Sequence, residues 1–191
     1  MAWTVFIDGK EGTTGLRIFD RLAERGEFSL LTLPEEKRKD ADARREAIHA
    51  ADISILCLPD AAARESVALA EGSKTRILDT STAHRVAPGW AYGFPELSKK
   101  HRDAVISGQY VAVPGCHASG FIALAAPLVA AGLIPADTLL SCFSLTGYSG
   151  GGKKMIAEYE SPDRPAHSKL DAPKSYGLGL AHKHLPEMKE I

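Results

Sequence analysis

The stretch TVFIDGKEGTTGLRIFDRLAERG, residues 4–26, decides the fold. It opens with a short β-branched and aromatic run, and Leu16, Phe19 and Leu22 then recur at helical spacing. A glycine-rich turn joins the two parts, with glycines at positions 9, 12 and 15. A strand, a tight turn and a helix in this order predict the first unit of an α/β domain.

The same alternation continues downstream. Apolar runs predict strands over 28–34, 52–59 and 75–81, and helical patterns fill 42–50 and 60–72, where Asp60 is the expected helix cap. The run DISILCLP (52–59) is almost wholly apolar, which is typical of a parallel strand covered on both faces. We therefore expect a doubly wound, mostly parallel Rossmann-type sheet, whose ligand crevice lies beyond the carboxyl ends of its strands.

The rhythm changes after residue 80. We expect a long ordered loop from 83 to 97, one or two strands over 104–115, a helix over 117–131 interrupted near Pro127, and a strand over 137–153. Residues 161–177 are rich in proline and polar residues and predict a loop. These features place a nucleotide-binding domain at 1–113 and an incomplete α+β catalytic domain at 114–191.

Composition narrows the class of protein. The 191 residues are 45% hydrophobic and carry a net charge of −1, so broad attraction to nucleic acid or anionic lipid is not expected. No apolar run is long enough to cross a bilayer, and the N-terminus does not resemble a signal peptide. We expect a cytoplasmic protein.

The glycine turn is a candidate phosphate-binding loop. Gly9, Gly12 and Gly15 follow a G-x-x-G-x-x-G spacing, which differs from the usual dinucleotide fingerprint but still exposes backbone N–H groups at a helix start. Thr13 and Thr14 add hydroxyl groups. After the second strand, Glu35 or Glu36 could hold an NAD ribose, whereas residues 37–39, Lys-Arg-Lys, could hold a 2′-phosphate. The spacing of these residues does not decide whether the cofactor is NAD or NADP.

Three cysteines lie in different settings. Cys57 and Cys142 stand inside apolar runs and are expected to be small buried strand residues. Cys116 follows Pro114-Gly115 and precedes a predicted helix. A helix N-terminus stabilises a thiolate, so Cys116 is the candidate nucleophile.

A thiolate nucleophile needs an acid/base partner, and His182 and His184 in AHKHLPE are the most suggestive pair. Their alternation also fits metal ligands, but no third ligand is arranged nearby, so no metal is expected. The roles of His84 and His117 stay open, and the other histidines stand in polar surroundings.

Together these residues resemble the N-acetyl-gamma-glutamyl-phosphate reductases of arginine biosynthesis, in particular the shorter-chain type. The matching segments follow the family's order and cover nearly the whole chain: FIDGKEGTTGLRI (6–18), DISILCLPD (52–60), LDTSTAHR (78–85), YGFPEL (92–97), VAVPGCHASG (111–120), SLTGYSGGGK (144–153) and AHKHLPE (181–187). The PGC and HxHxPE motifs are far more specific than the glycine loop. One departure is that His117 stands where an aromatic residue is common.

The resemblance implies NADP-dependent reductive dephosphorylation of N-acetyl-glutamyl 5-phosphate to the semialdehyde. Cys116 matches the nucleophile that forms a thioester, hydride from NADPH reduces it, and His182 matches the acid/base group. The residues matching the cofactor site are Gly9, Gly12, Thr13, Thr14, Gly15, Pro59, Ser81 and Gly150. The candidates for holding or orienting the acyl-phosphate substrate are Arg85, Ser149, Lys153, His184 and Glu187.

The family continues well beyond HxHxPE, so we expect this chain to be part of a longer protein, with unpaired strand edges when alone. We also expect a homo-oligomer, a dimer or tetramer. Three alternatives remain: another phosphorylating semialdehyde dehydrogenase, a cofactor-independent cysteine acyl-transferase or hydrolase, and a non-catalytic nucleotide-binding regulator.

Overall fold

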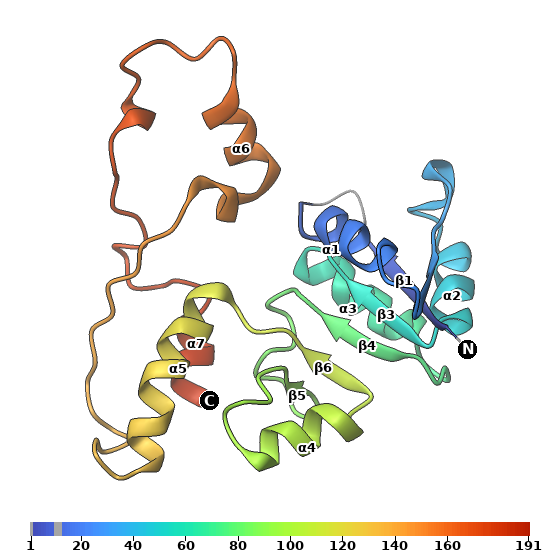
Figure 1. The fold of residues 1–191 in the computed structure, drawn as a ribbon, viewed down its shortest axis with the longest axis horizontal. Coiled ribbons are helices and arrows are strands. Elements are labelled where there is room, and N and C mark those ends of the chain that lie inside the picture. The colour runs from blue at the N-terminus through green and yellow to red at the C-terminus, as the bar shows by residue number, and fades with distance from the viewer. Residues whose placement is uncertain (1, 10–12) are drawn as a thin grey trace.

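The computed structural model describes residues 2–9 and 13–191. A six-stranded sheet forms its centre, in the order β2-β1-β3-β4-β6-β5, with every neighbouring pair parallel (Figure 1). The strands are β1 (Trp3–Asp8), β2 (Phe28–Leu31), β3 (Ile53–Leu56), β4 (Arg76–Asp79), β5 (Ala91–Tyr92) and β6 (Tyr110–Ala112). The expected doubly wound parallel sheet is confirmed.

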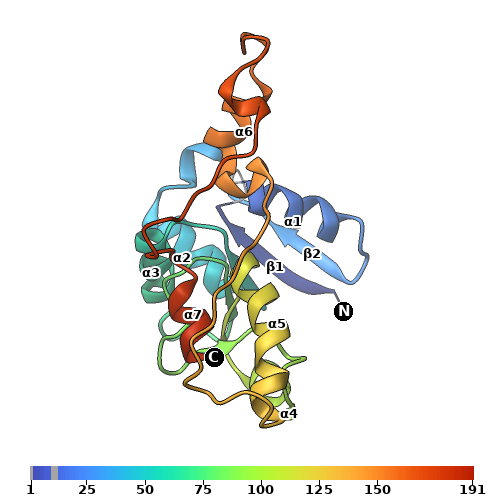
Figure 2. The same cartoon turned by 90° about the vertical axis from the view of Figure 1, so that its left-hand side faces the viewer.

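Helices cover both faces of this sheet, because alternate strand residues point to opposite sides. Phe6 and Leu56 pack with Ile48 of α2 on one face, whereas Val5 and Ile7 pack toward α1 on the other. Figure 2 shows α1 on one side of the strands and α2 and α3 on the other. The helices of this part are α1 (Thr13–Ala23), α2 (Ala41–Ala50), α3 (Asp60–Leu69) and α4 (Lys99–Ser107).

The second half of the chain is helical and irregular. It contains α5 (Cys116–Ala130), α6 (Gly152–Glu160) and the short α7 (Leu185–Glu190). A third apolar cluster joins α5 and α7 to the β5 end of the sheet through Tyr92, Ala118, Ile122 and Met188. Between α5 and α7 the chain forms an arm that carries α6 away from the sheet (Figure 1).

Several expectations about local structure were wrong. Residues 104–107 belong to α4, and α5 continues through Pro127, since a proline removes one backbone donor and bends a helix without always ending it. The N-cap of α3 is Pro59, because the Asp60 carboxylate instead accepts hydrogen bonds from Thr82.

The strand expected over 137–153 is also absent. Residues 138–147 have no regular secondary structure, and Tyr148–Gly151 form a 3₁₀ turn. A strand needs a hydrogen-bonded neighbour, and in the described part of the chain none pairs with this segment. Cys142 is therefore exposed rather than buried. The expected α+β character of this half does not appear among the described residues.

Within residues 2–9 and 13–191, no helix is long and apolar enough to span a membrane.

Candidate active site

Cys116 is the first residue of α5 and is exposed. Strand β6 ends at Ala112, and the Val113 N–H then donates to the Asp79 carbonyl (2.8 Å), which ties the following turn to β4. Gly115 is the N-cap and offers no side-chain acceptor, so the first backbone N–H groups of α5 stay available near the thiol. The expected position of the cysteine at a helix N-terminus is confirmed.

Gly115 is required at its position by space. A Cβ there would lie 2.5 Å from His184 Nε2 and 2.6 Å from Arg85 Nη1. Its φ of −72° is ordinary, so backbone strain is not the reason. The Gly115 N–H donates to Glu187 Oε2 (2.9 Å), which attaches the nucleophile's own turn to α7.

Glu187 is the centre of a buried polar network and is only 1% exposed. Its carboxylate also accepts from Arg85 Nη1 (2.6 Å) and from the Tyr92 hydroxyl (2.9 Å). Arg85 donates further to the carbonyls of Thr80 and Val113, both at 3.0 Å. Burial, together with the Glu187 charge, raises the pKa of Tyr92 well above its usual range.

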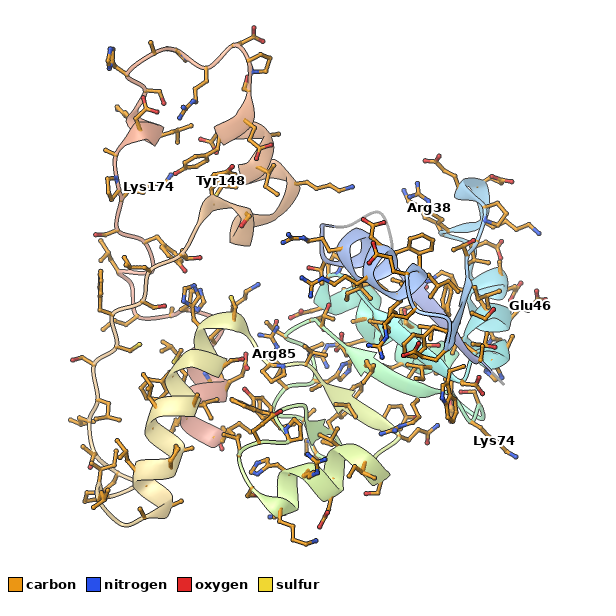
Figure 3. The ribbon with its side chains drawn as sticks, viewed as in Figure 1. Arg38, Glu46, Lys74, Arg85, Tyr148 and Lys174 are labelled. Carbon is orange, nitrogen blue, oxygen red and sulfur yellow. The ribbon has the colours of Figure 1, made fainter. Side chains whose placement is uncertain are left out.

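These contacts bear on two residues expected to hold substrate. Protein acceptors occupy Nε, Nη1 and Nη2 of Arg85, and protein donors occupy both oxygens of Glu187. These bonds tie both side chains to the turn before Cys116. Figure 3 shows Arg85 between the sheet and α5. Tyr92 was missed from the sequence, where it lies in an irregular proline- and glycine-rich segment without periodicity.

Three histidine rings gather beside the first turn of α5. The His182 and His184 centroids are 4.7 Å apart, and His117 lies 5.7 Å from the first and 5.8 Å from the second. Burial lowers the pKa of His184 to about 4, and burial with the nearby His117 and Lys183 also lowers that of His182. Both rings are therefore neutral near pH 7.

The tautomer of His182 follows from its contacts. Its Nδ1 accepts the His184 backbone N–H (3.2 Å), so the proton of the neutral ring lies on Nε2. That nitrogen is the atom able to donate to a developing oxyanion. Among the described residues, no group of three or more His, Cys, Asp or Glu side chains has the geometry of a metal site.

His117 joins the arm to the nucleophile helix. Its Nδ1 lies 2.6 Å from Ser144 Oγ and its Nε2 lies 2.7 Å from the Tyr176 hydroxyl. One ring thus contacts the outgoing and the returning segment of the arm. The sequence left His117 open, and the structure gives it this anchoring role.

A crevice of about 260 Å³ opens at the carboxyl ends of β3 and β4 and reaches Thr14 of α1. It lies where the chain order of the strands reverses, the usual place for a ligand in a doubly wound sheet. Its lining includes the predicted residues Thr14, Pro59, Ser81 and Arg85, and also Cys57, Leu58, Asp60, Thr80, Thr82 and Lys183. Cys57, expected inside a buried strand, instead follows β3 and is half-buried, and burial raises the pKa of its thiol to about 11.

The groups around the crevice fit a dinucleotide. Gly9 has φ +86°, and a Cβ there would lie 2.4 Å from the Cys57 carbonyl oxygen, so only glycine brings the loop this close to β3. Gly15 is buried in α1, whereas Gly12 and the Thr13 side chain lie outside what the structure describes. Of the residues expected at the cofactor site, Thr14, Pro59 and Ser81 line the crevice.

Ser81 is held by a buried carboxylate. Asp79 accepts from the Ser81 N–H (2.9 Å) and hydroxyl (2.7 Å), and its Oδ2 lies 2.6 Å from His84 Nδ1. His84 in turn stacks on Trp90, with centroids 4.2 Å apart. His84 therefore supports the crevice wall through Asp79.

Other predicted residues are not brought to this site. Ser149, Gly150 and Lys153 lie on the arm, exposed or nearly so, and no contact joins them to the crevice or to the histidines in the described part of the chain. In Figure 3 the neighbouring Tyr148 lies well apart from Arg85.

Two family models match the chain. Residues 4–105 match the semialdehyde dehydrogenase NAD binding domain, and residues 116–191 match the semialdehyde dehydrogenase dimerisation domain. A solved structure of aspartate semialdehyde dehydrogenase II from Vibrio cholerae has a TM-score of 0.62 at 16% identity, covering 89% of this chain and 56% of that one. That likeness concerns the fold alone.

Curated relatives are much more similar in sequence. N-acetyl-gamma-glutamyl-phosphate reductase of Chelativorans sp. (strain BNC1) is 53% identical over 99% of this chain and 60% of that protein. N-acetyl-gamma-glutamyl-phosphate reductase 2 of Pseudomonas putida is 50% identical over 97% of this chain and 58% of that protein. The chain thus spans about 60% of the length of these relatives, and the resemblance inferred from the motifs is confirmed. Because one family model covers more than half of the chain and the other most of the rest, the chain belongs to the semialdehyde dehydrogenase family.

Proposed function

We propose that the protein is an NADP-dependent N-acetyl-gamma-glutamyl-phosphate reductase. The observation that carries the proposal is the position of Cys116, exposed at the start of α5 and next in sequence to His117 of the histidine cluster. The relatives at 50–53% identity supply the substrate: N-acetyl-glutamyl 5-phosphate.

Cys116 is the nucleophile in this proposal. Its thiolate forms a bond to the acyl carbon, the acyl–oxygen bond breaks, and phosphate leaves, which gives a thioester on the chain. The free N–H groups of the first turn of α5 stabilise the oxyanion that develops on the carbonyl. When bound, the reduced nicotinamide cofactor supplies the hydride for the redox chemistry.

His182 moves protons at this site. With Nδ1 held by the His184 N–H, its Nε2–H is the donor to the carbonyl oxygen, and the same nitrogen later takes the proton back as the sulfur leaves. Arg85 and Glu187 keep the turn before Cys116 in place, and Gly9, Thr14, Pro59 and Ser81 hold the cofactor.

NADP is proposed over NAD because residues 37–39 supply three cations just after β2. Arg38 is partly exposed and pairs with the exposed Glu35 (2.7 Å), an acceptor whose place a 2′-phosphate would take. Figure 3 shows Arg38 well apart from Arg85.

The remaining assignments are also proposals. The two family models support a boundary between residues 105 and 116, near the expected change at 113. The match to a dimerisation domain supports a homo-oligomer. A cytoplasmic location stays a prediction from the sequence.

The test is aldehyde oxidation with NADP and inorganic phosphate, using wild type, Cys116→Ser and Cys142→Ser. Loss of the nucleophile in Cys116→Ser should lower kcat by roughly 10³-fold or more. Cys142 is also exposed, so Cys142→Ser is a matched control, and its kcat should equal that of wild type. Full turnover by Cys116→Ser would remove the assigned chemistry. Hydrolase activity without saturable NADPH binding would instead identify a cofactor-independent cysteine enzyme.

A further inference from the structure

Lys183 stands between the two histidines of the cluster but lies on a different side of the chain. The rings of His182 and His184 contact each other and His117. Lys183 instead lines the crevice, together with Asp60 of α3 and residues 80–82 after β4. One short segment therefore presents histidines toward the nucleophile helix and an ammonium group toward the cofactor crevice.

The charges in the crevice make Lys183 distinctive. Arg85 is paired with Glu187, and the Asp60 carboxylate accepts the Thr82 N–H and hydroxyl. The Thr82 hydroxyl holds the pKa of Asp60 below its usual range, and Lys183 contributes to this, which places the ammonium near that carboxylate. Among the described residues, Lys183 makes no hydrogen bond or ion pair.

Thr14 of α1 lines the same space as the ammonium, and its hydroxyl makes no hydrogen bond within the described residues. The hydroxyls of three other lining residues already donate to protein acceptors: Thr80 to the Leu56 carbonyl, Ser81 to Asp79 and Thr82 to Asp60. An unpaired lysine beside a threonine hydroxyl offers two donors to a phosphate oxygen. A volume of about 260 Å³ is slightly below that of typical ligand pockets, so it suits part of a larger ligand.

We propose that Lys183 binds a phosphate group in this crevice and thereby also fixes the segment that carries His182 and His184. The inference rests on the proposed function, because that function supplies two phosphate sources. One is the pyrophosphate of the dinucleotide, and the other is the phosphate of the acyl-phosphate substrate. Binding of either phosphate to Lys183 would also hold His182 and His184 in place, because the three residues are consecutive in the chain.

The experiment compares Lys183→Gln with Lys189→Gln, an equal loss of charge at an exposed lysine on α7 outside the crevice. NADPH binding is measured by fluorescence titration, and inorganic phosphate binding by calorimetry on the protein with NADP present. Lys183→Gln should weaken one of the two ligands about tenfold, the effect of losing one charge-assisted hydrogen bond. Lys183→Arg should retain most of the affinity, and the ligand that weakens identifies the phosphate source.

The outcomes separate this inference from the proposed function. If wild type binds NADPH and phosphate and Lys183→Gln binds both equally well, Lys183 is not a phosphate ligand, while the proposed reaction stands. If Lys189→Gln weakens binding of the same ligand equally, the effect comes from the net charge of the protein and not from a contact with Lys183, and the inference is overturned. If wild type binds neither ligand, the proposed function falls and the inference falls with it.

Discussion

Replacing Glu187 with glutamine tests the network that holds the turn before Cys116. The side chain is 1% exposed and accepts from Arg85 (2.6 Å), Tyr92 (2.9 Å) and the Gly115 N–H (2.9 Å). Glutamine keeps the shape but has one acceptor oxygen, and its NH₂ group would face a donor. At least one of the three donors then loses its partner, and the buried guanidinium loses its counter-charge.

The expected cost is large. Removing one partner of a buried ion pair costs about 3–5 kcal/mol, because the other charge stays buried without compensation. For a chain of this size, that corresponds to a fall in Tm on the order of 10 °C. Glu190→Gln on the same helix is the control, since Glu190 is exposed and its loss should change stability by less than about 0.5 kcal/mol.

Two measurements check this prediction. Urea unfolding gives the free-energy difference, and hydrogen exchange at the Gly115 amide reports whether α7 has left its position without global unfolding. In Glu187→Gln, this amide should exchange faster than in wild type, because its acceptor is weakened. A Glu187→Gln protein within 0.5 kcal/mol of wild type, with unchanged Gly115 exchange, would refute the positioning role.

Three further changes are expected. Gly115→Ala should destabilise by about 1–3 kcal/mol in urea unfolding, because its Cβ would lie 2.5 Å from His184 Nε2, whereas Gly120→Ala in open space should stabilise α5 by about 0.5–1 kcal/mol. The pKa of His184 is about 4 in the folded chain, below the usual 6.5, so the native state binds fewer protons between these values. Its contribution to stability is therefore complete above pH 6.5 and lost as the pH falls toward 4, and urea midpoints across this range should fall less steeply in His184→Gln. Iodoacetamide at pH 8 should alkylate the exposed Cys116 but not Cys57, because the pKa of the Cys57 thiol is raised to about 11. Peptide mass spectrometry measures the alkylation of each cysteine.

The first half of the fold could be predicted because its signals are local. Alternating strands and helices show directly in the periodicity of residues 4–81, and the almost wholly apolar run 52–59 indicates a strand covered on both faces. The position of Cys116 was likewise local, since Pro114 and Gly115 separate a β-type run from a helical one. Helix α4 was missed because its first half is strongly charged and its second half reads as a strand.

The arm could not be predicted in the same way. Leu139, Phe143 and Leu145 alternate as in a strand, yet all three are exposed. A period of two shows only that a segment is able to form a strand, and pairing depends on a neighbour that the segment itself does not encode. The strand predicted over 137–153 is absent because no neighbouring strand pairs with it among the described residues, although its apolar pattern suits a strand.

Some features of the candidate site follow from the local sequence, and others depend on residues that are distant in the chain. The motif around Cys116 indicates a nucleophile, but nothing local explains why residue 115 must be glycine, since its φ of −72° suits any residue. The requirement comes from Arg85 and His184, which approach it from distant parts of the chain. Arg85 and Glu187, whose ion pair lies beside this turn, are 102 residues apart in the sequence. The sequence alone indicates Cys116 as the candidate nucleophile, whereas the contacts that Arg85, His184 and Glu187 make around Gly115 are defined only once the fold brings them together.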